Sequence, residues 1–276
     1  MSDTTRRAVV AERAARAGGA VAREQFRTDL DVESKADKND LVTATDREAQ
    51  EQVVTTLREA FPADALVCEE DALPPGVTDV EIRESVPETE AAWVVDPIDG
   101  TANFVRELRF WTTSVAAVVD GETVGAATYL PAEEDIYASG PEGATRNGSP
   151  MAVSERTDPE TFAVGLLGWW PMGRGEEHAA LFRASAERFG DLRRMGSMQG
   201  MLALVAAGGL DAAYMPARPH PWDSLAGVHM IREAGGRVTD RHGEPWERDS
   251  EGLVVSNGKA HDVVLKVLQD GREQDA

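Results

Sequence analysis

The chain has 276 residues, of which 42% are hydrophobic, so it is long and apolar enough for one large domain or two modest ones, and wholesale disorder is excluded. Its 49 acidic and 28 basic residues give a formal net charge of −21, which disfavours nonspecific binding to nucleic acid or to an anionic membrane. It shows no membrane-length apolar run and no secretory signal, and its single cysteine, Cys68, excludes an internal disulfide, so we expect a cytoplasmic protein.

Helices and strands alternate in the N-terminal half. Helix-forming composition or amphipathic spacing predicts helices over residues 5–26 and 46–61. Strand patterns occur at 41–46, 65–70 and 93–100. Residues 71–91 carry three prolines and many acids, and we expect an exposed excursion there. A hairpin is predicted over 111–131 with its turn at Asp120–Gly121, followed by one or two short strands.

The C-terminal half continues in the same way. Apolar or alternating runs predict strands at 162–168, 237–240 and 253–257. Helices are predicted at 176–189, 197–209, 222–236 and 259–269, and Ser197 is predicted to cap the second of these helices. We interpret Trp169–Trp170 and Trp222 as core or dimer-interface residues. Together these elements indicate a layered α/β or α+β architecture in two subdomains, which we place at residues 1–152 and 153–276.

The shortage of lysine is a further feature of the composition. Only four residues are lysine, so arginine supplies nearly all of the positive charge. Like charges on an acidic surface repel one another, and salt screens this repulsion. The composition resembles that of proteins from salt-loving organisms, and it predicts a halophilic protein that loses stability when salt is removed.

Carboxylates stand at four junctions between predicted elements. They are Asp46, the pair Glu69–Glu70, the pair Asp96 and Asp99, and Asp223. Taken singly, each has a structural interpretation, because an aspartate caps a helix well and a glutamate at a strand end is readily solvated.

The segment DPIDGT at residues 96–101 favours a chemical interpretation instead. Pro97 fixes its own φ and pushes Asp96 into an extended conformation. Two carboxylates on one turn repel each other unless a cation lies between them, and Mg²⁺ prefers such oxygen ligands, including a carbonyl such as that of Ile98. The helix start at Gly100–Thr101 offers free N–H groups to a phosphate. The turn therefore indicates metal-assisted phosphoester chemistry.

These motifs resemble the inositol monophosphatase family, which includes archaeal-type fructose-1,6-bisphosphatases and nucleotide 3′-phosphatases. The resemblance runs through DLVTATDREAQ, CEED, WVVDPIDGTANFV, RNGSPMAVS, RMGSMQGMLALVAAGGLDAAY and PWDSLAGVHMIREAGGRVTD. It implies an alternating αβαβα sandwich of the sugar-phosphatase type. By this resemblance, the N-terminal subdomain, residues 1–152, would carry most metal ligands, and Asp223 in the C-terminal subdomain, residues 153–276, would complete the site.

The resemblance also implies residue roles. Two or three Mg²⁺ ions would be held by Glu69, Asp96, the Ile98 carbonyl, Asp99 and Asp223. Thr101 and Asp46 would orient and help to deprotonate the attacking water, with Glu70 beside them, either not touching the metal or on a third, weaker ion. Substrate and phosphate contacts would come from Asp99, Gly100, Thr101, Arg218 and Asp223. Homodimer formation and inhibition by lithium are implied in the same way.

Two positions depart from the family pattern. Cys68 replaces a glycine; we interpret it as a small buried residue, with a redox switch as the alternative. Inositol-specific relatives carry a substrate-binding glutamate where this chain has Met215 or Pro216. Nearby Arg218 is either a solvated loop residue or a contact for a second anionic group, which would favour a bisphosphate substrate. His220 has the same two interpretations.

The leading functional hypothesis is a Mg²⁺-dependent phosphomonoester hydrolase acting on inositol monophosphate, fructose 1,6-bisphosphate or both. The alternatives are a 3′(2′),5′-bisphosphate nucleotidase and a non-catalytic, moonlighting role in binding a protein partner. A pure binding module need not retain the full catalytic set, yet this chain has all six of its side chains: Asp46, Glu69, Asp96, Asp99, Thr101 and Asp223.

Overall fold

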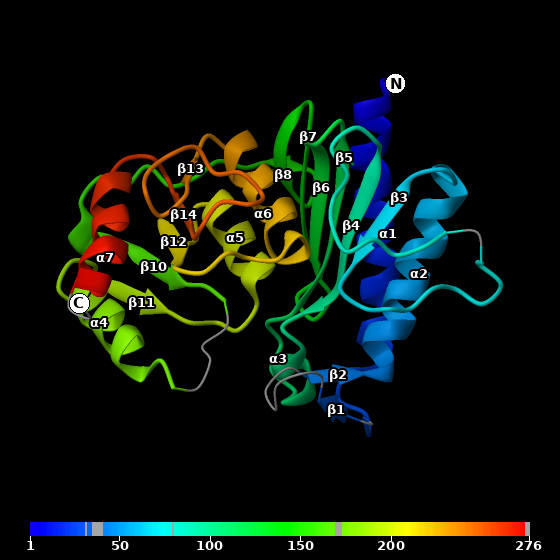
Figure 1. Ribbon diagram of the computed structural model, residues 1–276, viewed down its shortest axis with the longest axis horizontal. Helices are drawn as coiled ribbons and strands as arrows, with labels where there is room; N and C mark the ends of the chain where they lie inside the picture. Colours follow the sequence, from blue (N-terminus) through cyan, green and yellow to red (C-terminus); the bar gives the residue numbers. More distant parts are fainter. Residues whose placement is uncertain (31, 35–40, 79, 169–172, 274–276) are drawn as a thin grey trace.

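The computed structural model describes residues 1–30, 32–34, 41–78, 80–168 and 173–273 (Figure 1). Trp169–Trp170 therefore lie outside the described residues. Seven α-helices are assigned in the described part of the chain: α1 (Asp3–Gln25), α2 (Ala44–Ala60), α3 (Thr101–Val105), α4 (Gly175–Ala186), α5 (Met198–Ala206), α6 (Pro221–Glu233) and α7 (His261–Glu273). A short 3₁₀ helix covers Pro159–Thr161.

Most strands of the N-terminal half form one seven-stranded sheet. Its strands, in spatial order, are β3 (Ala65–Cys68), β4 (Ala92–Asp99), β5 (Thr112–Val119), β6 (Glu122–Leu130), β7 (Asp135–Gly140), β8 (Gly143–Arg146) and β9 (Ser149–Pro150). β3 and β4 are parallel, and the other neighbours are antiparallel. The predicted hairpin is present between β5 and β6, where Asp120 and Gly121 have φ values of 49° and 80°. Three strands follow it rather than one or two.

A five-stranded sheet forms in the C-terminal half. Its order is β11 (Asp191–Arg193), β10 (Ala163–Leu166), β12 (Ala212–Met215), β14 (Leu253–Ser256) and β13 (Arg237–Thr239). β10 pairs parallel with β11 and β12, whereas β14 pairs antiparallel with β12 and β13. A separate two-stranded ribbon joins β1 (Val32–Ser34) to β2 (Leu41–Thr43).

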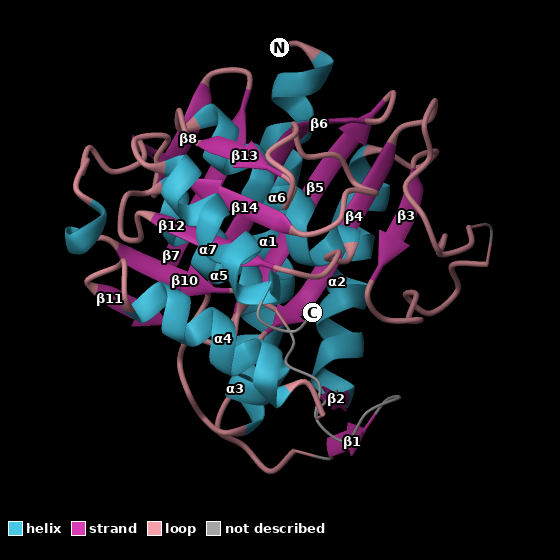
Figure 2. Cartoon of the chain, turned by 60° about the vertical axis from the view of Figure 1, so that its left-hand side comes forward, coloured by secondary structure: helices cyan, strands magenta, loops and turns pink. Residues whose placement is uncertain are grey.

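The helices and sheets stack in five layers (Figures 1 and 2). Helices α1 and α2 cover one face of the seven-stranded sheet, α5 and α6 lie between the two sheets, and α4 and α7 cover the outer face of the five-stranded sheet. The middle layer belongs to one hydrophobic cluster that runs from Val94 on β4 through Leu202 on α5 and Leu225 on α6 to Val255 on β14. This αβαβα arrangement confirms the predicted fold class. The division at residue 152 stays a prediction, since the two halves share this core.

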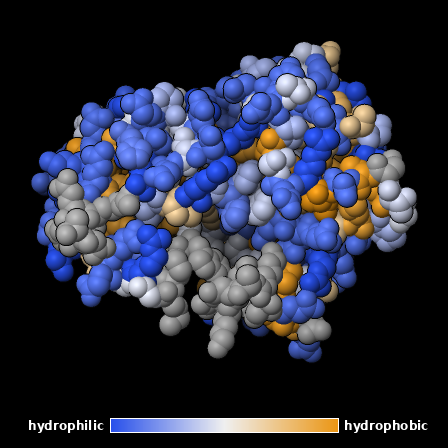
Figure 3. Space-filling model, in the orientation of Figure 1, coloured by the Kyte–Doolittle hydropathy of each residue, from blue (hydrophilic) through white to orange (hydrophobic). Residues whose placement is uncertain are grey.

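Strands β1 and β11 lie where the sequence predicts no strand, and two further segments differ in detail from the prediction. Helix α2 begins at Ala44, so strand β2 is short and Asp46 lies inside the first helical turn, where it completes a capping box with Thr43. The excursion at 71–91 has many exposed residues, as expected, but Ile82 bridges to Leu66 on β3 and extends that edge of the sheet. The face drawn in Figure 3 is mostly hydrophilic, in keeping with the charged composition.

Candidate active site

Strand β4 delivers two acids to the inner face of the seven-stranded sheet. Side chains alternate along a strand, so Trp93 and Val95 pack toward α1 and α2, whereas Val94 and Asp96 face α5 and α6. The pairing of β4 with β5 then shifts register between Asp96 and Asp99. Such an irregularity re-aims side chains. Both acids are therefore buried, at 2% and 7% exposure, on the side of the sheet where α6 lies.

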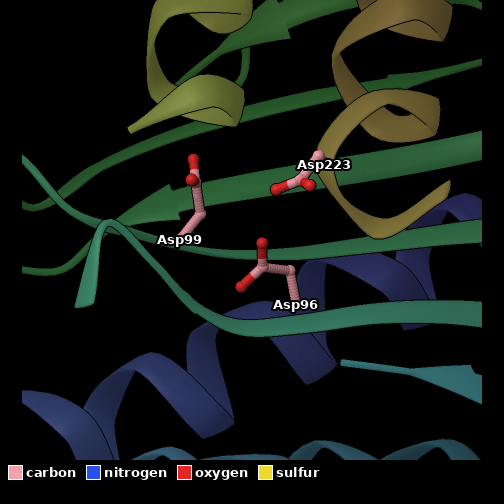
Figure 4. Close-up of side chains that lie close together, drawn as sticks. All are labelled: Asp96, Asp99 and Asp223. Carbon is pink, nitrogen blue, oxygen red and sulfur yellow. The ribbon is translucent and has the colours of Figure 1, made fainter. Parts of the chain in front are cut away.

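Asp223 joins these two acids from the first turn of α6. One carboxylate oxygen from each of Asp96, Asp99 and Asp223 lies within 4.8 Å of the others, and Figure 4 shows the three side chains around a common space. Glu69, which follows β3, hydrogen-bonds to Asp96. Burial raises the pKa of Asp96 well above its usual value, and the charges of Glu69, Asp99 and Asp223 raise it further.

The donor set fits a hard cation. Asp96 Oδ1 is buried and has no hydrogen-bond partner among the residues that the structure describes. An unpartnered buried carboxylate oxygen is costly, and several carboxylates in one place repel one another. A divalent cation with oxygen ligands removes both penalties. Asp96, Asp99 and Asp223 are therefore placed to hold such an ion. Glu69 lies beside them at the end of the neighbouring strand, where its N–H donates to the Val95 carbonyl (3.1 Å), and the Ile98 carbonyl lies two residues after Asp96.

Asp99 is also held by the N-terminus of α5. The main-chain N–H of Met198 donates to Oδ1 (2.9 Å), and the N–H of Gln199 donates to Oδ2 (2.6 Å). The Ser197 hydroxyl donates to Oδ2 as well (2.6 Å), while its oxygen accepts from the N–H of Gly200 and so caps the helix. Burial raises the pKa of Asp99, and these hydrogen bonds oppose the rise. The sequence predicted that Ser197 caps α5 but did not reveal its hydrogen bond to Asp99.

A second carboxylate-centred group lies beside the acids. Thr101 Oγ1 is 3.2 Å from Asp46 Oδ1 and 3.0 Å from the Ile98 carbonyl oxygen. On the other side, Thr43 donates to Asp46 Oδ2 through its N–H (2.8 Å) and its hydroxyl (2.6 Å). Burial raises the pKa of Asp46 to about 6, the hydrogen bonds from Thr43 and Thr101 lower it, and the charge of Glu70 raises it. Asp46 is thus a buried carboxylate poised to accept a proton near neutral pH.

The loop after β3 is fixed by a buried glutamine of α2. Gln50 Nε2 donates to the carbonyls of Glu70 (2.6 Å) and Ala72 (2.7 Å), and its Oε1 accepts from the N–H of Glu70 (3.0 Å). Gln50 lies one helical turn after Asp46, so a single helix positions both the base and the acidic loop. No sequence pattern indicated this role, since Gln50 looks like an ordinary polar residue of a helix.

The turn itself depends on Gly100. Its φ is 98°, in the left-handed region, and it is the N-cap of α3. A Cβ at this position would lie 3.0 Å from the Gly196 carbonyl oxygen and 3.2 Å from Ser197 Cβ. The segment before α5 therefore packs directly on the backbone that separates Asp99 from Thr101.

Three residues that the sequence analysis left with two interpretations lie in ordinary surroundings. Arg218 is exposed, and its Nε donates to the Arg248 carbonyl (3.2 Å), so among its described contacts none joins it to the acids. His220 stacks on Trp222 with ring centroids 4.8 Å apart. Cys68 is buried at the end of β3, and burial raises the pKa of its thiol, which fits a small packing residue. No described helix combines the length and apolarity needed to cross a membrane.

Comparisons with known proteins agree over nearly the whole chain. A profile of the inositol monophosphatase family matches residues 3–273. The fructose-1,6-bisphosphatase/inositol-1-monophosphatase of Thermotoga maritima is 34% identical over 244 residues, covering 88% of each chain. The Nus factor SuhB of Escherichia coli K12 is 30% identical over 266 residues, covering 95% of each. The solved IMPase structure of Thermotoga maritima superposes with a TM-score of 0.84 at 30% identity, covering 96% of this chain and 97% of that one. The chain therefore belongs to the inositol monophosphatase family.

Proposed function

We propose that this protein is a Mg²⁺-dependent phosphomonoester hydrolase that acts on inositol monophosphate, fructose 1,6-bisphosphate or both. The observation that carries the proposal is the buried group of Asp96, Asp99 and Asp223, with Asp96 Oδ1 unpartnered among the described residues. Family membership and the names of the relatives, which include an inositol-1-monophosphatase of Bacillus subtilis, support the reaction class.

The metal ligands would be Glu69, Asp96, Asp99, Asp223 and the Ile98 carbonyl, holding two or three ions. When bound, Mg²⁺ supplies a Lewis acid that polarises the phosphate and lowers the pKa of a water molecule. Asp99 is acceptor to the N-terminus of α5, which fixes the direction of its carboxylate before any ion arrives. Asp96 and Asp223 face it from β4 and α6.

The proton of the attacking water would pass through Thr101 to Asp46. Thr101 Oγ1 lies within hydrogen-bonding distance of both Asp46 Oδ1 and the Ile98 carbonyl, so its single proton can be given to Asp46 while its oxygen accepts one from water. Thr43 holds the far oxygen of Asp46 and leaves Oδ1 for Thr101. Glu70 would tune Asp46 by its charge. Gly100 and Thr101 would contact the phosphate through their N–H groups.

The residues that would choose the substrate differ from those that would carry out the hydrolysis. A relative at 34% identity is named for both fructose 1,6-bisphosphate and inositol 1-phosphate hydrolysis, which supports dual activity. Arg218 is exposed on the loop that leads to α6, where its Nε donates to the Arg248 carbonyl, and it would be the contact for a second phosphate. A 3′(2′),5′-bisphosphate nucleotide remains the alternative substrate.

A second candidate role is binding of a protein partner. One relative, at 30% identity, carries the name Nus factor SuhB. With a net charge of −21, this chain would favour a basic partner. The homodimer, lithium sensitivity and cytoplasmic location expected from the sequence also stay predictions.

Phosphate release tests the main proposal. We expect purified protein with Mg²⁺ and high salt to hydrolyse inositol 1-phosphate or fructose 1,6-bisphosphate, with adenosine 3′,5′-bisphosphate as the third substrate of the panel. Asp96→Asn should lower kcat by about 100-fold or more, because the metal contribution is worth several kcal/mol. Asp249→Asn, an exposed acid-to-amide change outside the site, is the matched control and should keep full activity. Undiminished turnover in Asp96→Asn or after complete chelation would refute the mechanism.

A further inference from the structure

Gln199, the second residue of α5, contacts two segments that carry metal-site acids. Its main-chain N–H donates to Asp99 Oδ2 (2.6 Å). Its side chain turns to α6, where Nε2 donates to the Trp222 carbonyl (2.5 Å) and Oε1 accepts from the N–H of Gly227 (2.8 Å). The residue is fully buried, and its carboxamide has a partner for both its nitrogen and its oxygen.

The two contacts on α6 lie on either side of Asp223. Trp222 precedes this acid, and the N–H of Gly227 is the one that an ordinary α-helix directs back toward the carbonyl of Asp223. The carboxamide of Gln199 therefore hydrogen-bonds to the N-terminal part of α6 at two points that flank Asp223. Helices α5 and α6 pack closely at this point, since a Cβ on Gly227 would lie 2.9 Å from Gln199 Oε1 and 2.3 Å from Leu202 Cβ.

A link of this kind meets an electrostatic need. Asp99 and Asp223 come from different layers, and together with Asp96 they bring three carboxylates within 4.8 Å. Ionised carboxylates at this spacing repel one another, and α6 could relieve the repulsion by moving away. A neutral carboxamide resists this movement through directed hydrogen bonds without adding a charge to the site.

We infer that Gln199 is a positioning residue that sets the spacing of Asp99 and Asp223 for the divalent cation. The inference rests on the proposed function, because it concerns the metal of the same site. Residues that hold metal ligands in place typically change metal affinity by about 10- to 100-fold when they are replaced. We expect a loss near the lower value, since the contact from the Gln199 main chain to Asp99 survives any substitution.

The test is Mg²⁺ binding to metal-free protein, measured by titration calorimetry. Gln199→Met keeps a long side chain of similar volume and removes both hydrogen bonds to α6. Met201→Ala is the control on the same helix, because the Met201 side chain is buried against Gly165 of the five-stranded sheet. We expect the dissociation constant for Mg²⁺ to rise about 10-fold in Gln199→Met and to stay at the wild-type value in Met201→Ala. Excess Mg²⁺ should restore kcat in Gln199→Met to within about 3-fold of wild type, giving a shift in metal requirement rather than in turnover.

The outcomes separate this inference from the proposal on which it rests. No Mg²⁺ binding by the wild-type protein would refute the proposed function itself. Wild-type binding with an unchanged dissociation constant in Gln199→Met, whether or not the melting temperature falls, would overturn the positioning role and leave the proposed function standing. Gln199→Ala, which shortens the side chain and keeps the helix-favouring backbone, is the second variant and should show the same rise in dissociation constant.

Discussion

Replacing Gly100 by alanine perturbs the turn between Asp99 and Thr101 in two separable ways. The first is conformational, because Gly100 has a φ of 98° and a side chain in the left-handed region costs about 1–2 kcal/mol. The second is steric, because the new Cβ would meet the Gly196 carbonyl at 3.0 Å and Ser197 Cβ at 3.2 Å. Overpacking of this kind typically costs about 1–3 kcal/mol. We therefore expect a total loss of about 2–5 kcal/mol in the free energy of unfolding.

Gly76 provides the matched control. Its φ is 86°, so alanine there meets the same conformational penalty, but a Cβ would have nothing within 4 Å. Gly76→Ala should cost only about 1–2 kcal/mol, and the difference between the two variants measures the packing of the Gly196–Ser197 segment on the turn. Urea unfolding followed by circular dichroism gives both values.

The same pair of variants separates stability from activity. A displaced turn moves the Asp99 carboxylate and the Thr101 hydroxyl together, and a misplacement of about 1 Å can cost about 100-fold in rate. Phosphate release by Gly100→Ala should fall by about that factor at a temperature where the variant is folded, whereas Gly76→Ala should be fully active. Equal destabilisation of the two variants, or a normal rate in Gly100→Ala, would refute the reasoning.

Three further predictions follow from the buried titratable groups and the charge. Thr43→Val removes a hydroxyl that stabilises ionised Asp46, so the pKa of Asp46 should rise above about 6 and the acid limb of the pH–kcat profile should move to higher pH. Thr43→Ser keeps a hydroxyl and should restore the wild-type profile. An acid limb that does not move in Thr43→Val would contradict the assignment of Asp46 as the base. Burial lowers the pKa values of His229 and His261 to about 4 from 6.5, so the unfolded chain takes up protons first: their contribution to stability is complete above pH 6.5 and is lost as the pH falls toward 4. Urea midpoints across this range should fall accordingly, and less steeply in His229→Gln; identical slopes would argue against a role for this histidine. Finally, salt screens the repulsion within a chain of net charge −21, because the Debye length falls from about 10 Å at 0.1 M salt to about 3 Å at 1 M. The melting temperature should therefore rise between about 0.1 and about 2 M KCl, and an unchanged melting temperature would refute the halophile hypothesis.

Local patterns in the sequence were enough to predict most helices and strands and the turn that carries the acids, whereas the αβαβα order of the layers was implied by the family resemblance. The proline, the glycine and the paired aspartates of DPIDGT are neighbours in the chain, so their geometry follows from short-range backbone rules. Asp46 was harder to place, because the strand pattern of 41–46 continues past the point at which the Thr43 capping box starts α2. Residue propensities do not show whether such a segment will continue a strand or begin a capped helix, because the cap depends on side-chain hydrogen bonds to the backbone.

Contacts between distant segments were beyond the reach of these patterns. Ser197 was predicted to cap its helix, and it does, but its bond to Asp99 joins residues 98 positions apart. The buried amides of Gln50 and Gln199 look like surface residues in the sequence, since glutamine is mostly exposed in proteins. Only the packing of α2 and α5 reveals what they hold.

The order of synthesis gives the layered arrangement a further consequence. The seven-stranded sheet is complete when β9 has been made, yet α5 and α6, which cover its inner face, are encoded later in the chain. Until they emerge from the ribosome, apolar side chains such as Val94, Ala116 and Val118 have no cover, and Asp99 lacks the helix N-terminus that receives it. Uncovered sheet faces promote association between nascent chains. The core beneath α1 and α2 consists entirely of residues from the N-terminal half, so it is the part of the packing that can be complete while these side chains are still uncovered.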